Sequence, residues 1–387
     1  MRFTGLASCL VIVAGVASAH PGHDISQEIV ERREFLSTVK RNDLSHCAER
    51  LKARGVLERN VARRSAQVEK ERAKRGLKKR DLDGVLNTSH NKTELGYTAV
   101  TDPALLFEGY NSCLLTPEVT QGPYYVGGEY IRRNIIEEQE GVDIVLDYQV
   151  IDVDTCEPIP NVYVEIWHCN ATGVYSGVVA DGNGDSSDET NIDNTFLRGI
   201  QKTNEDGVAQ FESIFPGHYT GRATHIHVMV HTNVTRYCNG TLGNEVSASH
   251  VGQTFFDQTL ISEVELQAPY NTNQQELRLN ADDSILAEEA ATDGVDPFME
   301  YTLLGNSVSD GLFAWLAFGI NATQVQSITP AVFYYEDGGV ANPDSGSGGG
   351  GPGGDFPGSN GTVPSGVPSG NPTDAPTESP TASSTAA

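Results

Sequence analysis

Apolar and polar residues alternate through the middle of the chain. Residues 142–153 largely alternate, and residues 162–167 resume the pattern after a proline-containing turn. Such alternation is typical of β-strands with one buried face, and this pair indicates a hairpin with a long loop. Residues 195–203 and 207–211 predict two more strands around a short turn. Short strands at this spacing, with few helical patterns between them, predict an all-β domain, an antiparallel β-sandwich.

A helical periodicity precedes the strands. Apolar residues between positions 24 and 75 recur about every 3.6 residues, without an intervening proline, which predicts helix. A basic triplet ending at Arg80 follows, and then a polar linker to about Leu95. Two interpretations of residues 20–80 are open. They form a pro-segment that is cut after Arg80, or a helical arm that packs on the domain and is never cleaved.

The two ends of the chain differ from the rest. An arginine, an apolar run over residues 6–16 and small residues at 17–19 predict a secretory signal peptide in residues 1–19. The run is too short to span a membrane. Residues 343–387 are rich in Gly, Pro, Ser and Thr, cannot bury a core, and predict a disordered tail. Between the helical segment with its linker, residues 20–95, and this tail lies one domain, residues 96–342.

The charge of the domain limits the kinds of molecule that it is expected to bind. Residues 96–387 contain 7 Lys or Arg against 40 Asp or Glu. A domain this acidic is not expected to bind nucleic acid or an anionic membrane. Seven Asn-X-Ser/Thr sequons fit a glycosylated, secreted protein. The expected location is therefore extracellular, and association with a cell wall is left open.

Five cysteines remain once the signal peptide is removed, an odd number for an oxidising compartment. At least one is therefore unpaired within the chain. Two bridges among the four domain cysteines fit the sequence, but the sequence does not fix the pairing. These four are Cys113, Cys156, Cys169 and Cys238.

Candidate metal-binding and catalytic residues cluster between residues 219 and 227. His225 and His227 are two residues apart in an apolar run that predicts a strand, so both imidazoles point to one face. Imidazole binds zinc, copper, iron and nickel, so the other ligands determine which metal is bound. Tyr219 is the candidate for such a ligand, because a phenolate suits a hard, highly charged cation such as ferric iron. Arg222 lies between the tyrosine and the histidines.

These residues match a known pattern. A tyrosine follows a Pro-Gly-X turn, and an arginine stands three residues before His-Ile-His, here Tyr219, Arg222 and residues 225–227. A second segment, Glu-Ile-Trp-X-X-Asn-X-X-Gly-X-Tyr, ends at Tyr175. The chain resembles the intradiol ring-cleavage dioxygenases, the catechol and protocatechuate dioxygenases, and most closely their secreted single-chain fungal members. The resemblance covers about residues 112–335. One departure is Ala223, where bacterial members carry proline.

The resemblance implies a site and a role for each residue. A mononuclear, non-haem Fe(III) ion would be held by two tyrosines and two histidines. Tyr219 would give way to the substrate and take up its proton, and Arg222 would stabilise developing negative charge. A turn before the first strands would line the substrate pocket. The implied ligands are Tyr175, Tyr219, His225 and His227, and the pocket turn is Gly122, Pro123 and Tyr124.

The expected function is therefore a secreted intradiol dioxygenase. Its partners would be a catechol-type molecule and O2, and ring cleavage between the two hydroxylated carbons would give muconate-type diacids. The sequence leaves the oligomeric state open, a dimer included. One alternative is a secreted β-sandwich that binds aromatics, metal or wall polymer without turnover. Another is a zinc hydrolase that uses His225 and His227, although the chain has no His-Glu-X-X-His motif.

Overall fold

The structure, a computed structural model, describes residues 47–75, 112–113, 122–232, 234–243, 247–290 and 296–345. All of these residues belong to one compact unit. The predicted signal peptide, the linker before the domain and nearly all of the predicted tail lie outside the described residues.

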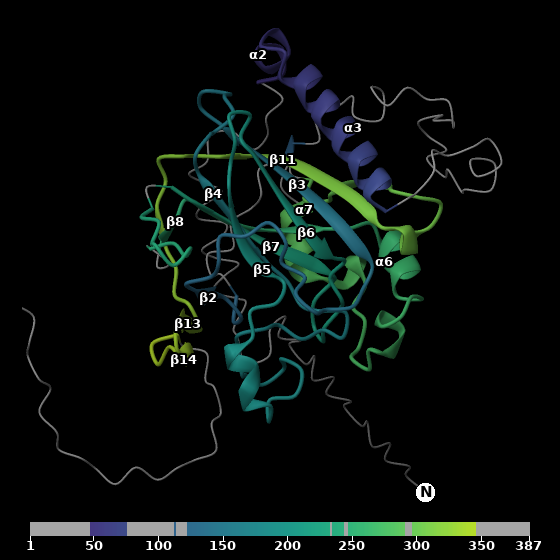
Figure 1. Ribbon diagram of the computed structural model, residues 1–387, viewed down its shortest axis with the longest axis vertical. Helices are drawn as coiled ribbons and strands as arrows, with labels where there is room; N and C mark the ends of the chain where they lie inside the picture. Colours follow the sequence, from purple (N-terminus) through teal and green to yellow (C-terminus); the bar gives the residue numbers. More distant parts are fainter. Residues whose placement is uncertain are drawn as a thin grey trace, which may run out of the picture. The chain divides into compact units, whose positions relative to one another are not determined.

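Strands outnumber helices in the described part of the chain (Figure 1). The α-helices are α2 (Ala48–Ala53), α3 (Val56–Lys74), α6 (Gln258–Val264) and α7 (Ser284–Ala290). The 3-10 helices are η2 (Glu189–Asp193), η3 (Tyr270–Thr272), η4 (Asn280–Asp282) and η5 (Val308–Asp310). The strands are β1 (Ser112–Cys113), β2 (Val126–Gly127), β3 (Asp143–Asp152), β4 (Tyr163–Trp167), β5 (Arg198–Lys202), β6 (Val208–Ile214), β7 (His225–His231), β8 (Ser247–Ala248), β9 (His250–Phe255), β10 (Glu300–Leu303), β11 (Leu312–Ile320), β12 (Gln326–Ser327), β13 (Val332–Tyr335) and β14 (Gly338–Ala341).

Two main sheets share one apolar core. The first has the order β1-β11-β3-β6, with β10 paired to β11, and the second has the order β5-β4-β7-β9. Alternate residues of β3, such as Leu146 and Tyr148, meet alternate residues of β7, such as Ile226 and Val228, in this core. Burial of the two inner faces holds the sheets together. The prediction of an all-β sandwich is confirmed.

Strand pairing differs from the expected hairpins. β3 and β4 lie in different sheets, and so do β5 and β6, so neither pair forms a hairpin. β3 instead pairs antiparallel with β6 and parallel with β11, which makes the first sheet mixed. Alternation along a strand shows which face is buried but does not identify the neighbouring strand. The hairpin prediction was therefore wrong although the strands themselves were correctly located.

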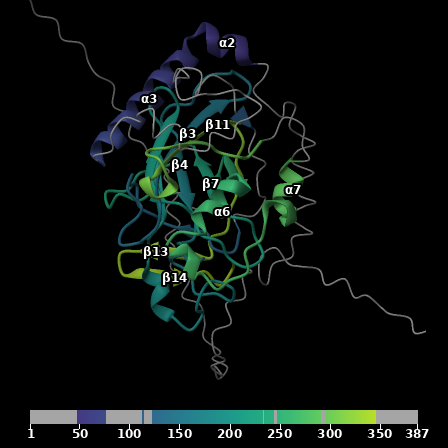
Figure 2. The ribbon, with the colours of Figure 1, turned by 90° about the vertical axis from the view of Figure 1, so that its right-hand side faces the viewer.

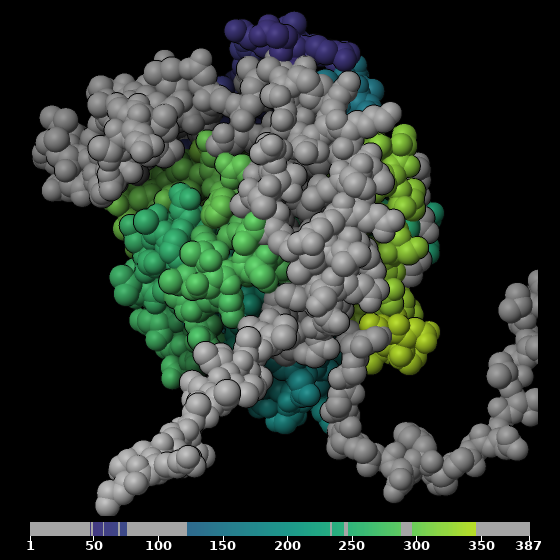
Figure 3. Space-filling view, turned by 180° about the vertical axis from the view of Figure 1, so that it is seen from behind, coloured from purple at the N-terminus to yellow at the C-terminus, as the bar shows by residue number. Residues whose placement is uncertain are grey.

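Helices α2 and α3 cover the outer face of the first sheet (Figures 1 and 2). Val68 of α3 packs in one cluster with Val145 of β3 and Phe313 of β11. Arg64 pairs with the fully buried carboxylate of Asp147, 3.4 Å away. Helix is thus confirmed for the described part of residues 24–75, and residues 24–46 lie outside it. This arm, residues 47–75, packs on the domain and lies at the top of the rear view in Figure 3.

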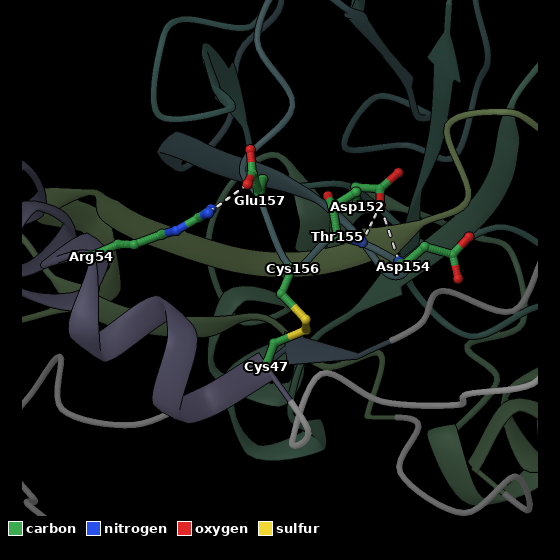
Figure 4. The surroundings of a disulfide bond; sticks show 7 residues. All are labelled: Cys47, Arg54, Asp152, Asp154, Thr155, Cys156 and Glu157. Atoms are coloured by element: carbon green, nitrogen blue, oxygen red, sulfur yellow. Dashed lines mark hydrogen bonds and ion pairs between the residues drawn. A yellow bond between two sulfur atoms is a disulfide. The ribbon is translucent and has the colours of Figure 1, made fainter.

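A disulfide ties the arm to the loop between β3 and β4. Cys47, just before α2, is bonded to Cys156 (Figure 4). Beside it, Arg54 forms an ion pair with Glu157 at 2.5 Å. Cys156 therefore has its partner in the arm rather than in the domain, which corrects the expectation of two bridges among the domain cysteines. Among the described side chains, Cys169 is a buried thiol and Cys238 an exposed one.

We expect Cys47→Ser to lower the stability of the protein. The bridge joins residues 109 positions apart, and closing a loop of about 100 residues is worth up to about 4.7 kcal/mol in the chain-entropy model. Thermal unfolding of the variant should begin at the arm, seen as earlier proteolysis within residues 47–75. Cys238→Ser, which removes an exposed thiol, is the matched control and should unfold like the wild type. Equal melting temperatures for all three proteins would show that packing alone holds the arm.

Candidate metal centre

Strand β7 carries the two candidate histidines on the outer face of the second sheet. Ile226 and Val228 point into the shared core, so His225 and His227 point to the opposite side. Both rings are buried, and their Nε2 atoms lie 3.1 Å apart. Two nitrogen ligands about 2.1 Å from one ion, roughly 90° to 110° apart, are separated by about 3.0 to 3.4 Å. The spacing therefore fits two ligands of a single metal ion.

Neighbouring groups orient each imidazole. His225 Nδ1 lies 2.7 Å from the carbonyl oxygen of Ala223, and as the donor of that bond it leaves the Nε2 lone pair for a ligand. The ring of His227 stacks on Trp167, with centroids 4.7 Å apart and an angle of 4° between the planes. Trp167 therefore packs directly against a candidate ligand.

Tyr175 sits in a loop whose backbone is held by asparagine side chains. Asn183 Oδ1 accepts from the Tyr175 N–H at 2.7 Å, and Asn183 Nδ2 donates to the Tyr175 carbonyl at 2.8 Å. Asn191 Nδ2 donates to the same carbonyl at 2.9 Å. Both asparagines belong to the polar loop of residues 180–194, so this loop fixes Tyr175 in place.

Tyr219 lies on the turn before β7, packed against the loop of Tyr175. A side chain at Gly217 would place its Cβ 2.3 Å from the carbonyl oxygen of Asn170, so only glycine allows this contact. The two tyrosine rings meet edge to face, with centroids 5.4 Å apart. Tyr219 lies 5.8 Å from His225, and Tyr175 lies 6.1 Å from His227, also edge-on. The four rings thus surround a common centre.

Burial favours the neutral forms of the candidate ligands. Burial, and then the neighbouring Tyr219, raises the pKa of Tyr175 well above its ordinary value. Burial, followed by the cation of Arg222, lowers the pKa of His225 well below its ordinary value. A highly charged ion would reverse the preference of the phenols and accept the neutral imidazoles. Within the described residues no group of three or more His, Cys, Asp and Glu could hold a metal, so a metal bound by the two histidines would need other donors, such as the tyrosines.

Arg222 is fully buried and bonded on two sides. Its Nε donates to Asp283 Oδ2 at 2.9 Å, and its Nη2 donates to Gln253 Oε1 at 2.5 Å. The same Asp283 oxygen accepts from the Ala223 N–H at 2.7 Å. Burial alone would raise the pKa of Asp283, but Arg222 and the hydrogen bonds outweigh it and lower that pKa to about 2. Asp283 is therefore an anion that holds the arginine.

The Ala223 contact explains the departure from the bacterial pattern. Proline has no N–H and could not make this bond to Asp283. Alanine at this position gives the carboxylate a second donor beside the guanidinium. The departure therefore leaves the histidines in place and adds a restraint on Arg222.

The predicted pocket turn lies beside the ligands. A Cβ on Gly122 would come within 3.3 Å of Cε1 of His227. The Tyr124 ring is 4.9 Å from the Tyr175 ring and 6.1 Å from the Tyr219 ring. Pro123, which lies between Gly122 and Tyr124 in the chain, is also buried. The turn is thus placed where it would touch a molecule bound at the centre.

Sequence motifs did not identify several residues that lie beside the candidate site. Arg198, Trp167, His227 and Gln253 form one cross-strand row over β5, β4, β7 and β9. Residues paired in this way project from the same face of a sheet. Spacing along the chain carries no signal for Gln253 or Asp283, because their contacts depend on distant segments. Arg198 does have a signal, the scarcity of cations in the domain.

Comparison with known proteins agrees with the site. A family model described as a dioxygenase matches residues 120–262, which include all four candidate ligands. Catechol 1,2-dioxygenase of Acinetobacter baylyi is 32% identical over 110 residues, 27% of this chain and 32% of that protein. Catechol 1,2-dioxygenase 1 of Acinetobacter lwoffii is 26% identical over 143 residues, 31% of this chain and 43% of that protein. The chain thus spans less than half of either curated relative.

A solved structure extends the match. The intradiol ring-cleavage dioxygenase of Tetranychus urticae is 33% identical, and the alignment covers 55% of this chain and 97% of that one, with a TM-score of 0.45. The 33% identity extends over nearly the whole Tetranychus urticae chain, and the family model matches the segment that carries the candidate centre. The chain therefore belongs to the intradiol ring-cleavage dioxygenases.

Proposed function

We propose that the protein is a secreted, non-haem Fe(III) intradiol dioxygenase that cleaves catechol-type rings between the hydroxylated carbons. The observation that carries the proposal is the meeting of four buried rings, with the two imidazole Nε2 atoms 3.1 Å apart. Tyr175, Tyr219, His225 and His227 would hold the ion. When bound, ferric iron would supply the charge that binds a deprotonated catechol and the electron transfer that permits reaction with O2.

The two tyrosines differ in the side chains that bond their own backbone groups. Asn183 and Asn191 bond the backbone of Tyr175 on both its N–H and its carbonyl. Tyr219 lies on a turn whose own backbone bond, from Arg222 N–H to the Tyr219 carbonyl, is 3.5 Å long. This difference supports Tyr219 as the group that moves and takes a proton from the substrate hydroxyl, while Tyr175 stays in place.

Arg222 would act by charge. A guanidinium stays protonated and has no lone pair for a metal, so it cannot replace a ligand. Asp283 and Gln253 fix its direction, and a fixed cation can stabilise negative charge that develops on the substrate. The product would be a muconate-type diacid that contains both atoms of O2.

Export from the cell forms part of the proposal. The Cys47–Cys156 bond supports an oxidising compartment, and among the described residues no helix is long and apolar enough to cross a membrane. The preferred catechol and the oligomeric state are left to experiment.

The function is tested with purified protein loaded with ferric iron. We expect one iron per chain, a red to burgundy colour from ferric tyrosinate, and a muconate-type product from at least one of catechol, hydroxyquinol and protocatechuate. His227→Ala should lose iron and colour together, since it removes one of four ligands. His231→Gln is the matched control, because His231 lies on the same face of β7 but pairs with Glu165. A colourless wild type, or coloured stoichiometric iron in His227→Ala, would contradict the proposal.

Arg222→Ala should separate charge from ligation. We expect near-normal iron content and colour, with kcat/KM lower by about 10²-fold or more, the scale of one lost electrostatic donor. Folding stability should also fall, by about 3 to 5 kcal/mol, because Asp283 is left buried without its cation. Arg64→Ala, which breaks a buried pair under the arm, should cost stability without affecting turnover. Unchanged turnover in Arg222→Ala would assign Arg222 to structure alone.

N-terminal sequencing of the secreted protein tests how the chain is processed. A single N-terminus at His20 would show that residues 20–80 stay joined to the domain by the backbone, and an additional N-terminus at Asp81 would show a cut after Arg80. Even after such a cut, Cys47–Cys156 would keep the arm attached. The two pieces should then separate on a gel only under reducing conditions. Protein that is found only inside the cell would contradict export.

A further inference from the structure

Arg198 is a buried cation that takes no part in the proposed chemistry. It is the first residue of β5, and its side chain is 1% exposed. The domain has few cations, and burying one is costly unless its donors are satisfied. The position of Arg198 therefore calls for a physical reason.

The guanidinium of Arg198 joins two segments of the candidate site. Nε donates to the Ser176 carbonyl at 3.0 Å, and Nη2 donates to the same oxygen at 2.6 Å. Nη2 also donates to the Tyr124 carbonyl at 2.7 Å. Ser176 directly follows the candidate ligand Tyr175, and Tyr124 belongs to the pocket turn. One side chain thus connects the ligand loop to the pocket wall.

The sheet fixes the direction of Arg198. Arg198 pairs with Trp167 in the ladder between β5 and β4, and Trp167 pairs with His227 in the ladder between β4 and β7. All three side chains project from one face. The same row that places His227 therefore places the guanidinium under Tyr175 and Tyr124.

Among the described residues, Glu129 is the one acidic side chain within 4 Å of the Arg198 guanidinium, and the contact is weak. Its Oε1 lies 3.7 Å from Arg198 Nε, too far for a hydrogen bond. Burial raises the pKa of Glu129 to about 8, although Arg198 opposes the shift. The short contacts of Arg198 are those to the two carbonyls and one from Nε to Ser176 Oγ at 3.1 Å.

We propose that Arg198 is a positioning residue that sets the placement of Tyr175 relative to the pocket turn at Tyr124. The role rests on the proposed function, because it matters for catalysis only where Tyr175 binds the metal. It predicts that weakening the guanidinium contacts of Arg198 makes the Tyr175 loop and the pocket turn more mobile together. A lysine at this position keeps the charge, but a single ammonium on a flexible stem cannot reproduce the planar fork.

The test compares Arg198→Lys with the wild type, both free of metal, by hydrogen exchange and mass spectrometry. We expect exchange in residues 122–127 and 174–178 to be faster by on the order of 10-fold, since both segments lose an anchor. Arg64→Lys is the matched control, because it alters another buried arginine, under the arm. It should speed exchange only within the arm. Glu129→Gln, which keeps both carbonyl contacts, should leave the two site segments unchanged.

A second readout separates positioning from general packing. Loaded with ferric iron, Arg198→Lys should show a weaker or shifted ferric-tyrosinate band at the same iron content as the wild type. Unchanged exchange in the two segments would overturn the proposal, and so would faster exchange with an unchanged band. If the wild type takes up no coloured iron and cleaves no catechol, the proposed function fails. The exchange comparison then decides by itself whether Arg198 anchors the two segments.

Discussion

The pairing of β7 between β4 and β9 is the constraint on which the candidate centre depends. It sets His227 opposite Trp167 on one side and Gln253 on the other. A slip of one residue would turn both histidines into the shared core and bring Ile226 to the site. The buried inner face of β7 excludes that slip, because imidazoles would replace apolar side chains in the core. Hydrophobic burial on one face therefore determines the chemistry on the other.

The same division of faces recurs on the first sheet. Inner residues of β3 form the shared core, while Asp147 and Gln149 of its outer face are covered by the arm. A strand with polar residues buried on one side needs a partner that satisfies them. The arginines and Asn60 of α3 do this, and the disulfide at Cys47 fixes the start of the arm. The arm is thus part of the folded unit and not an appendage.

The features predicted correctly from the sequence are those that depend on residues close together in the chain. The spacing of His225 and His227 placed them on one face, and alternation placed β3 and β4 within a residue or two. Tyr219 was proposed from its chemistry beside the histidines, and Tyr175 came from resemblance to a family pattern, since no periodicity joins positions 175 and 219. Strand partners, the parallel β3–β11 pair and the Cys47–Cys156 bond could not be predicted, because each joins segments far apart in the chain. Asp283 was missed for the same reason, and its contact with Ala223 explains a departure that sequence could only note.

Positive charge is scarce beyond residue 95, so a buried arginine there calls for a physical reason. Arg222 and Arg198 are both such residues. Arg222 lies three residues before the candidate ligand His225, and Arg198 donates to the carbonyl of Ser176, which follows Tyr175. In an acidic domain that needs no cation for its core, a buried arginine persists where its donors fix backbone or charge that something else requires. Arg222 fixes charge beside the histidines, and Arg198 fixes backbone beside Tyr175. Under the proposed function, the two arginines would hold the two halves of one centre, Arg222 the histidine half and Arg198 the tyrosine half.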